Sequence, residues 1–415
     1  TSFVGYDDLA AEDVRVLKYR TVKEKGHNFI QMILDKTPFY PEGGGQVGDT
    51  GRLLFGNETV KVQDTKKENN IIIHYVDKIP ENVALPVSAF VDYKKRQLTE
   101  CNHSSTHLLH AALRQVLGNH VQQKGSLVKD ELLRFDFSHF DKMTDDELRE
   151  VEAIVNKKIR ENIALEEARS IPIEEAKEAG AMMLFGEKYG DNVRMITFDS
   201  EFSRELCGGC HVDSTGQIGL FKIVSESGIA AGVRRVVAIS SDEAEKYIQK
   251  ELDKLESIAQ LFKNPQDIVA SVEALQEENK NLKKKIEEMQ ASKAGDIKQE
   301  LLTKLEDIGG IQLIAERVQL ADSKALKTLV FNLEKELTNA VVLIANENAG
   351  KVQLLLKINE GLVQEKGWDA GQIIRSLASH IKGGGGGQKF FATAGGSDAS
   401  GIDQAIEEMK QIIKS

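Results

Sequence analysis

The chain has 415 residues, of which 41% are hydrophobic and 29% charged, with six prolines, and this composition excludes a disordered or collagen-like chain. A chain of this length is expected to form two or three domains, and its apolar runs are far shorter than the roughly 20 residues that span a bilayer. The formal net charge of −11 weighs against nucleic-acid binding but does not exclude it. Salt limits the range of electrostatic interactions to about 10 Å, so a local basic surface can bind RNA on an acidic protein.

The N-terminus shows no signal-peptide pattern, and three cysteines in so long a chain favour a cytoplasmic protein over a disulfide-stabilised one. No membrane association is expected. The missing initiator Met is typical of a processed protein or a fragment.

Residues 1–95 are predicted to be rich in β-strands and to form a barrel-like part. Short alternating runs at 27–34 and 70–76 are separated by Gly, Asn and Asp residues that favour turns. The segment TPFYPEGGGQVGDTG at 37–51 interrupts them with five glycines. The basic residues 94–96 that follow are a candidate RNA-binding surface.

Residues 96–241 are predicted to form an α/β core. The stretch 108–118 has the apolar spacing of an amphipathic helix, and residues 132–140 alternate like a strand. A second helix is expected over 145–162, opening after Thr144 as its N-cap.

Residues 242–305 are predicted to be helical and to carry a coiled-coil seam. Apolar residues follow a four-three spacing on either side of Asn264-Pro265, which breaks the helix. Asn279 stands at a seam position and is typical of a polar residue that sets helix register. The pattern predicts either an antiparallel helical hairpin or a coiled coil between two chains, and leaves both open. The seam residues are Ile248, Leu252, Leu255, Ala259, Phe262, Ile268, Val272, Leu275, Leu282, Ile286 and Met289.

Residues 306–415 are predicted to form a small α/β domain with a strand over 352–358. It contains the run GGGGG at 383–387, flanked by Lys382 and Lys389. As a bare pattern such a run is typical of a flexible loop. The fold class expected for the whole chain is therefore α+β, with four parts.

The stretch ELCGGCHV carries two of the three cysteines and a histidine within five residues, Cys207 to His211. This CxxCH pattern fits a haem attachment, a redox dithiol or half of a metal site. The haem interpretation requires export of the protein to an oxidising compartment, and the sequence shows no sign of export. The dithiol interpretation leaves a second histidine cluster unexplained.

That second cluster is CNHSSTHLLH, in which His103 and His107 stand four residues apart at the start of the amphipathic helix. The spacing places both imidazoles on one helix face. Together with Cys207 and His211 they form a set of three nitrogens and one sulfur, which suits zinc. Taken singly, such a histidine pair is more often an ordinary surface or core pair.

Cys210 and Cys101 remain alternative fourth ligands in place of Cys207 on the residues alone. Their other interpretation is that of small, half-buried thiols.

Several segments, in the order in which they occur, resemble the editing domain of the alanyl-tRNA synthetase family. They are TPFYPEGGGQVGDTG, CNHSSTHLLHAALRQVLGNHVQQKGSLV, LRFDFSHF, GAMMLFGEKYGDNVR, ELCGGCHV and SGIAAGVRRVVAI. The tail GGGGGQKFFATAGGSDASGIDQAI is similar to the C-terminal domain of that family, which is related to a domain of DHH phosphoesterases. The resemblance spans essentially the whole chain and implies the C-terminal half of a bacterial enzyme, without the class II aminoacylation domain.

Two departures from the family pattern are visible. Cys210 stands where the family usually has Thr, and Gly43 or Gly44 stands where it usually has Ser. The first departure implies that the CxxC spacing is accidental and that the ligand pattern is Cys-x-x-x-His.

The resemblance implies zinc ligands at His103, His107, Cys207 and His211, and an editing pocket lined by Thr106 and Gln123. Other interpretations from the residues alone are a helix N-terminal Thr at 106 and a solvated loop Gln at 123. Gly44 and Gly45 would let the 3′ end of tRNA approach the backbone, or simply make a tight turn. Arg234 and Arg235 are candidates for phosphate contact or a solvated pair at a strand edge, and Lys382 and Lys389 are candidates for tRNA contact.

The expected function is proofreading, the hydrolysis of tRNA(Ala) mischarged with serine or glycine, by a zinc-dependent site. The expected partners are tRNA(Ala) and, through the C-terminal half, a second copy of the chain. Two alternatives stay open: a free-standing trans-editing deacylase, and a non-catalytic RNA-binding or dimerisation module with structural zinc.

Overall fold

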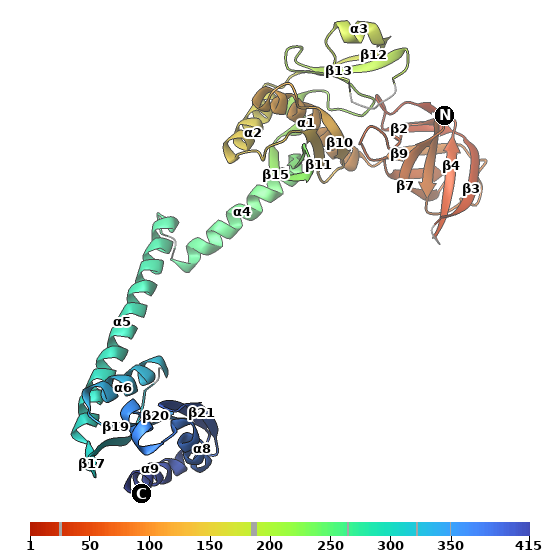
Figure 1. The fold of residues 1–415 in the computed structure, drawn as a ribbon. Helices are drawn as coiled ribbons and strands as arrows, with labels where there is room; N and C mark the ends of the chain where they lie inside the picture. Colours follow the sequence, from red (N-terminus) through yellow and green to blue (C-terminus); the bar gives the residue numbers. More distant parts are fainter. Residues whose placement is uncertain (25–26, 184–188, 264, 321–322, 349) are drawn as a thin grey trace. The chain divides into compact units, whose positions relative to one another are not determined.

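The structure, a computed structural model, describes residues 1–415 apart from 25–26, 184–188, 264, 321–322 and 349. It divides into two compact units, Thr1–Ile258 and Ala259–Ser415, which are described separately (Figure 1). The finer division into four parts stays a prediction. No described helix is both long and apolar enough to cross a bilayer.

The first unit begins with a seven-stranded sheet in the order β2-β9-β6-β7-β8-β4-β3. Its edge strands β2 and β3 form no ladder with each other among the described residues, so the predicted barrel is not closed. Arg15 alone separates these two strands along the chain, and this covalent link requires the sheet to curl until its edges come near. The strands are β2 Ala10–Val14, β3 Val16–Glu24, β4 His27–Leu34, β6 Gly51–Phe55, β7 Glu58–Glu68, β8 Ile71–Val76 and β9 Val87–Val91, and β1 Ser2–Phe3 pairs separately with β5 Lys36–Thr37.

Helix α1, Tyr93–Leu117, is the centre of the rest of this unit, and its middle is buried from Cys101 to Leu113. Asp92 caps its N-terminus by accepting from the backbone N–H of Lys95. Helix α1 packs with α2 and with a four-stranded sheet, order β10-β11-β16-β15, around one apolar core. The elements are α2 Asp145–Arg160, β10 Gln123–Val128, β11 Leu133–Ser138, β15 Phe221–Ala230 and β16 Val233–Ser240.

Two predicted elements of this core are confirmed. Helix α2 opens at Thr144, whose hydroxyl accepts from the backbone N–H of Glu147 while the Glu147 carboxylate accepts from the backbone N–H of Thr144. This capping box satisfies two backbone donors that the helix leaves without partners. The strand-like stretch 132–140 contains β11.

A small three-stranded sheet, order β12-β13-β14, leads into the ELCGGCHV stretch. Its elements are β12 Glu166–Pro172, α3 Ile173–Glu178, β13 Asn192–Phe198 and β14 Ser203–Leu206, and the 3-10 turn η1 Thr215–Ile218 follows.

The expectation of a basic RNA-binding surface at residues 94–96 is wrong for Arg96, whose side chain is fully buried. Its Nε lies 3.0 Å from both carboxylate oxygens of Asp49, and its terminal nitrogens donate to the carbonyls of Gly5 (2.7 Å) and Pro38 (3.1 Å). Arg96 therefore ties α1 to the segment 37–51 and to the N-terminus. A charge this deeply buried is stable only while it stays paired.

The helices around the break are α4 Ser241–Leu261 and α5 Ile268–Thr303. Asn264 of the predicted break lies outside the described residues. Six of the eleven seam side chains are exposed and the others are half-buried; the exposed ones are Leu252 and Leu255 on α4 and Leu275, Leu282, Ile286 and Met289 on α5. Hairpin and intermolecular coil both stay predictions.

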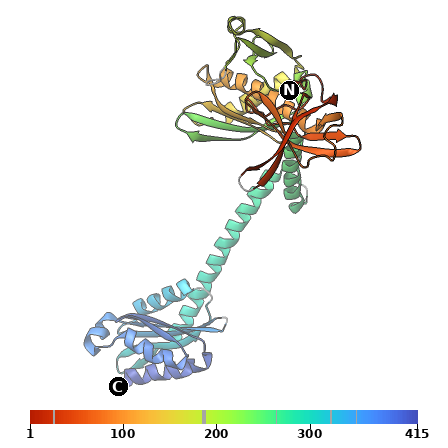
Figure 2. The ribbon, with the colours of Figure 1, turned by 90° about the vertical axis from the view of Figure 1, so that its right-hand side faces the viewer.

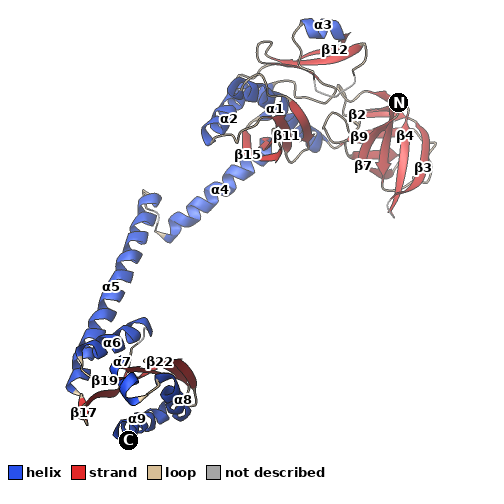
Figure 3. Cartoon of the chain, in the orientation of Figure 1, coloured by secondary structure: helices blue, strands red, loops and turns tan. Residues whose placement is uncertain are grey.

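The second unit has a six-stranded mixed sheet, order β17-β18-β19-β20-β22-β21. Helices lie on both faces of this sheet (Figures 2 and 3). One apolar cluster joins the sheet to α8 and α9, and another joins it to α5 and α6. The elements are β17 Glu306–Ile308, β18 Ile311–Val318, α6 Ser323–Glu336, β19 Ala340–Asn348, β20 Lys351–Ile358, α7 Glu360–Lys366, α8 Ala370–His380, β21 Gly384–Gln388, β22 Phe391–Gly396, η2 Ala399–Gly401 and α9 Ile402–Lys414. The strand predicted at 352–358 is confirmed as β20.

The glycine run 383–387 is not a loop, because its residues from Gly384 on belong to the edge strand β21. Helix α8 packs against this strand so closely that a Cβ on Gly371 would lie 2.9 Å from the carbonyl oxygen of Gly387. Glycine at 371 therefore permits the close contact between helix and strand, while Cβ atoms on Gly385 and Gly387 would clash with the neighbouring strand β22.

We predict that Arg96→Met destabilises the first unit by about 3–5 kcal/mol, because it leaves the Asp49 carboxylate buried without its cation. The measurement is urea unfolding followed by circular dichroism. The single tryptophan, Trp368, lies in the second unit, and its fluorescence transition should stay where it is in the unaltered protein.

The matched control is Arg169→Met, which breaks an exposed pair with Asp7 and should cost less than about 1 kcal/mol. Equal losses for the two variants would contradict the role given to Arg96.

Candidate functional site

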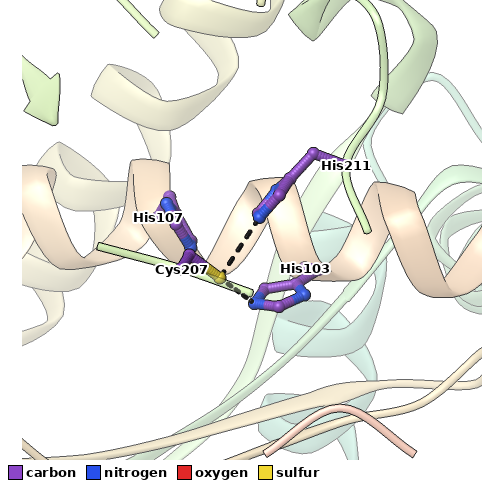
Figure 4. A group of neighbouring side chains, drawn as sticks. All are labelled: His103, His107, Cys207 and His211. Atoms are coloured by element: carbon purple, nitrogen blue, oxygen red, sulfur yellow. Dashed lines mark hydrogen bonds between the residues drawn. The ribbon is translucent and has the colours of Figure 1, made fainter. Parts of the chain in front are cut away.

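Four side chains meet between α1 and the stretch after β14 (Figure 4). His103 and His107 come from neighbouring turns of α1, and Cys207 and His211 follow β14. One ligand atom from each lies within 4.8 Å of the others. The Cys207 Sγ is 3.4 Å from Nε2 of both His103 and His211. The sequence prediction named these same four residues.

The chemistry of this group fits a zinc ion. Burial, reinforced by neighbouring cationic groups, lowers the pKa of His103 and His211 well below the usual value. Burial also lowers the pKa of His107, against the opposing charge of Glu205. Neutral imidazoles keep a nitrogen lone pair, which is the form that binds metal. Three such nitrogens and one sulfur in a tetrad match the borderline-soft ligand preference of Zn²⁺.

The loop at Cys207 is held in place from several sides. The backbone N–H of Gly209 donates to the Cys207 Sγ at 3.3 Å. Arg194 donates to the carbonyls of Cys207 (3.0 Å) and Gly209 (2.6 Å), and its guanidinium lies 4.1 Å from the centre of the Tyr6 ring. A Cβ on Gly209 would lie 2.0 Å from a ring carbon of His103, so only glycine fits there. The sulfur therefore has a defined position before any metal binds.

The other two cysteines lie outside this group. Cys210 is buried, and burial raises the pKa of its thiol to about 12. Cys101 donates to the carbonyl of Gln217 at 3.5 Å, and burial raises its pKa to about 11. The three cysteines form no disulfide. Buried thiols with raised pKa values are poor redox groups, so the geometry favours the metal interpretation over the dithiol.

Polar neighbours of the group were not predicted from the sequence. Gln46 lies 2.7 Å from Nδ1 of His103, and Ser104 Oγ lies 3.1 Å from Nδ1 of His211. The buried carboxylate of Glu205 lies 3.1 Å from Nδ1 of His110 and 3.9 Å from Nδ1 of His107. Burial acts to raise the pKa of Glu205, but the two histidines outweigh it and the net shift is downward.

Signals for some of these neighbours were present in the sequence. Glu205 stands within ELCGGCHV, and His110 is one helical turn beyond His107 on the same face. Gln46 follows the glycines of 43–45 and has no local signal, because its partner is 57 positions away.

A cavity of about 430 Å³ opens beside the four-residue group. His103, His107 and Cys207 line it, together with the predicted pocket residues Thr106 and Gln123. Its other lining residues are Gly44, Lys67, Ser126, Tyr189, Gly190, Asn192, Val193, Arg194, Glu205, Leu206 and Gly208. The structure thus brings the predicted metal ligands and pocket residues to one place.

The glycines at 43–45 make a tight turn. Gly43 and Gln46 exchange two backbone hydrogen bonds, of 3.1 and 3.0 Å, and the intervening Gly44 and Gly45 both have positive φ, 57° and 86°. Two positive φ values in a two-residue hairpin loop define a type I′ turn. Gly44 also lines the cavity, so the turn forms part of its wall.

Of the residues predicted to contact tRNA, Gly44 lines the cavity, whereas Arg234, Arg235, Lys382 and Lys389 are not among its lining residues. Arg234 makes two contacts with Glu226, of 2.5 and 2.7 Å, and Arg235 makes two with Asp136, of 2.6 and 2.7 Å. In the second unit Lys382 pairs with Asp398 at 2.7 Å. Lys389 is exposed between β21 and β22. A phosphate would have to compete with these carboxylates at three of the four positions.

Models of three protein families match the chain. They are "Threonyl and Alanyl tRNA synthetase second additional domain" at residues 193–237, "DHHA1 domain" at 310–415 and "tRNA synthetases class II (A)" at 1–95.

Relatives match along the whole chain. The alanine–tRNA ligase of Cytophaga hutchinsonii is 51% identical over 412 residues, 99% of this chain and 47% of that protein. The alanine–tRNA ligase of Christiangramia forsetii is 48% identical over 416 residues, which are 100% of this chain and 47% of that protein. The chain spans about half the length of these curated relatives. A crystal structure of the C-Ala domain from Aquifex aeolicus alanyl-tRNA synthetase covers 27% of this chain and 98% of that one, at 23% identity and a TM-score of 0.25.

We predict that Cys207→Ala lowers zinc content from about one ion per chain to near zero, since it removes the thiolate of a four-ligand group. Cys210→Thr, three residues away, should retain full occupancy. The measurement is elemental analysis of protein dialysed against a weak chelator. Zinc retained in Cys207→Ala, or lost in Cys210→Thr, would exclude the ligand set.

Proposed function

Because the chain belongs to the alanyl-tRNA synthetase family, we propose that it hydrolyses the ester bond of tRNA(Ala) that carries serine or glycine by mistake. The chain covers 47% of its relatives' length, and for the longer protein we propose the attachment of alanine to tRNA(Ala) with ATP. A cytoplasmic location goes with this proposal.

A hydrolytic activity of this kind is needed because a binding pocket for alanine discriminates only weakly against glycine and serine. A pocket that accepts alanine gains only about 1–3 kcal/mol per methylene, so it rejects glycine weakly. Nor does it strongly reject serine, which adds a single oxygen. A second, hydrolytic site removes both errors after the ester has formed.

The observation that carries the proposal is one cavity lined both by His103, His107 and Cys207 of the candidate zinc group and by Thr106 and Gln123. Its volume of about 430 Å³ is in the range of small-ligand pockets and suits an aminoacylated terminal nucleoside. When bound, zinc would supply positive charge that polarises the ester carbonyl, activates water or orients the aminoacyl group.

Thr106 can recognise the serine hydroxyl. Its Oγ1 donates to the carbonyl of Asn102 at 2.8 Å, one turn earlier on α1. The hydroxyl proton is thereby used, and the oxygen lone pairs remain to accept from a substrate hydroxyl. Glycine has no such group, so this contact would act on serine alone.

Gln123 has a complementary task. It stands at the first position of β10, beside an irregularity in the pairing with β11, and it is one of the residues that line the cavity. An amide can both donate and accept, and we propose that it holds a ribose hydroxyl or the attacking water.

For the second unit we propose binding to the outer corner of the tRNA, with Lys382 and Lys389 among the contacts. Both side chains are exposed, as a phosphate-binding surface requires. Pairing of two chains through the C-terminal half, with the exposed seam of α5 as one contact, belongs to the same proposal.

A non-catalytic module with structural zinc is the alternative that one observation favours, since structural zinc sites have four protein ligands. Hydrolysis of mischarged tRNA with and without a chelator separates the two functions. A free-standing deacylase differs from a synthetase part only in what precedes residue 1 in the gene.

We predict that Thr106→Val lowers kcat/KM for Ser-tRNA(Ala) by about tenfold or more, because an unmet buried hydrogen bond costs about 1–3 kcal/mol. Deacylation of Gly-tRNA(Ala) by the same variant should change less than twofold. An equal loss on both substrates would rule out recognition of the serine side chain by Thr106.

We also predict that deletion of residues 306–415 weakens tRNA(Ala) binding at least about tenfold in a gel-shift assay, since linked binding modules multiply affinity. Its control is hydrolysis of a short RNA hairpin that carries only the mischarged acceptor end, which should persist. Unchanged tRNA affinity would refute the role of the second unit.

A further inference from the structure

Gln46 reaches the metal-binding group from a distant part of the chain. The type I′ turn at Gly44 and Gly45 ends at Gln46, whose side chain is fully buried. The segment around it is docked on β10: the Val128 backbone N–H donates to the Gly45 carbonyl at 2.8 Å, and the Val47 N–H donates to the Val128 carbonyl at 3.1 Å. The amide of Gln46 is thus held at a fixed place beside His103.

The contacts of this amide determine which of its atoms faces the site. The Gln46 Oε1 lies 2.9 Å from the backbone nitrogen of Cys210 and 2.7 Å from Nδ1 of His103. A backbone N–H can only donate, so the atom that faces it must be the carbonyl oxygen. That oxygen cannot donate, and Nδ1 of His103 must therefore carry the hydrogen of their shared bond.

The protonation of Nδ1 decides the role of the opposite nitrogen. In a neutral imidazole only one nitrogen carries hydrogen, so Nε2 of His103 keeps its lone pair. This Nε2 is the atom that lies 3.4 Å from the Cys207 sulfur. The lone pair therefore points into the group that we assign to zinc.

We propose that Gln46 is a positioning residue of the metal centre: its carbonyl oxygen holds His103 in the tautomer that binds metal through Nε2 and anchors the Cys207–His211 loop through the N–H of Cys210. The inference rests on the proposed zinc site and deepens it. It also means that the N-terminal sheet region, which supplies none of the four ligands, completes the centre.

A packing role alone does not account for this residue. The Gln46 Nε2 is buried and has no hydrogen-bond partner among the described residues. A buried donor without a partner destabilises a protein, and an apolar side chain of similar size would avoid that cost. The two hydrogen bonds that the Gln46 oxygen accepts, from His103 and from Cys210, explain why an amide occupies this position. Acceptors of this kind, beyond the direct ligands, typically change metal affinity 10- to 100-fold.

The test compares Gln46→Leu, Gln46→Glu and the matched control Gln31→Leu in the full chain. Leucine removes the acceptor, whereas glutamate keeps an oxygen facing both donors. Gln31 is another buried glutamine, on β4, bonded to Arg20 and Tyr75 and not to the metal-binding group. The readouts are the Zn²⁺ dissociation constant from chelator competition, the visible spectrum of the Co²⁺-substituted protein, and the thermal midpoint without metal.

We expect Gln46→Leu to bind Zn²⁺ about 10- to 100-fold more weakly and to change the Co²⁺ ligand-field bands. Gln46→Glu should stay within about threefold of the unaltered protein, and Gln31→Leu should bind Zn²⁺ normally whatever its thermal midpoint. Metal binding is measured without tRNA, so the result stands apart from any failure of deacylation.

Unchanged affinity and spectrum in Gln46→Leu would overturn the proposal. So would a loss in Gln46→Glu equal to that in Gln46→Leu, or an equal loss in Gln31→Leu. If Gln46→Leu does not fold, Gln46→Met, which is close to glutamine in length and also lacks the acceptor oxygen, replaces it under the same expectations.

Discussion

The buried ion pair between Arg96 and Asp49 is the constraint on which the rest of the first unit depends. Arg96 lies at the start of α1, and Asp49 lies in the segment 37–51, where it also accepts from the backbone N–H of Tyr40 at 2.7 Å. The pair therefore fixes one end of the helix that carries His103 and His107 against the segment that carries Gln46. Burying a charge is unfavourable, and Arg96 offsets it with two further bonds to backbone carbonyls. The ion pair therefore fixes the position of α1 relative to the turn at Gly44 and Gly45.

The candidate site depends on three sets of contacts, of which the first is local to a helix and the last depends on the whole fold. Helix α1 presents two imidazoles by its periodicity alone, a property of any helix with histidines four residues apart. The Cys207 loop adds a sulfur and a third imidazole, but only because Gly209 leaves room for the ring of His103. Gln46 and Ser104 then hold Nδ1 of His103 and of His211, and the Glu205 carboxylate lies 3.9 Å from Nδ1 of His107, all of which depends on the tertiary fold.

These three sets of contacts explain how far the sequence alone could predict the structure. Each half of the predicted ligand set, His103 with His107 and Cys207 with His211, follows from local spacing, as does the Thr144 cap. The structure brings the four side chains together and confirms the cap, while metal binding by the four stays a prediction. Arg96 was mistaken for part of a basic surface, because its partners lie up to 91 positions away and leave no local pattern. The run 383–387 looked like a loop, since nothing within it announces that α8 packs on its backbone. Whether the seam of α4 and α5 pairs within or between chains depends on contacts that a heptad pattern does not specify.

The separation between Gln46 and Cys210, 164 positions, also has a consequence for how the protein is made. As the chain leaves the ribosome, the seven-stranded sheet emerges before the two imidazoles of α1, and the Cys207 thiol emerges about a hundred residues after them. A nascent chain that ends before His211 lacks at least one member of the four-residue group. The four-residue group can thus form only late in biosynthesis, and a truncated translation product that ends before His211 would present His103 and His107 without the complete group, a feature by which incomplete chains differ chemically from finished ones.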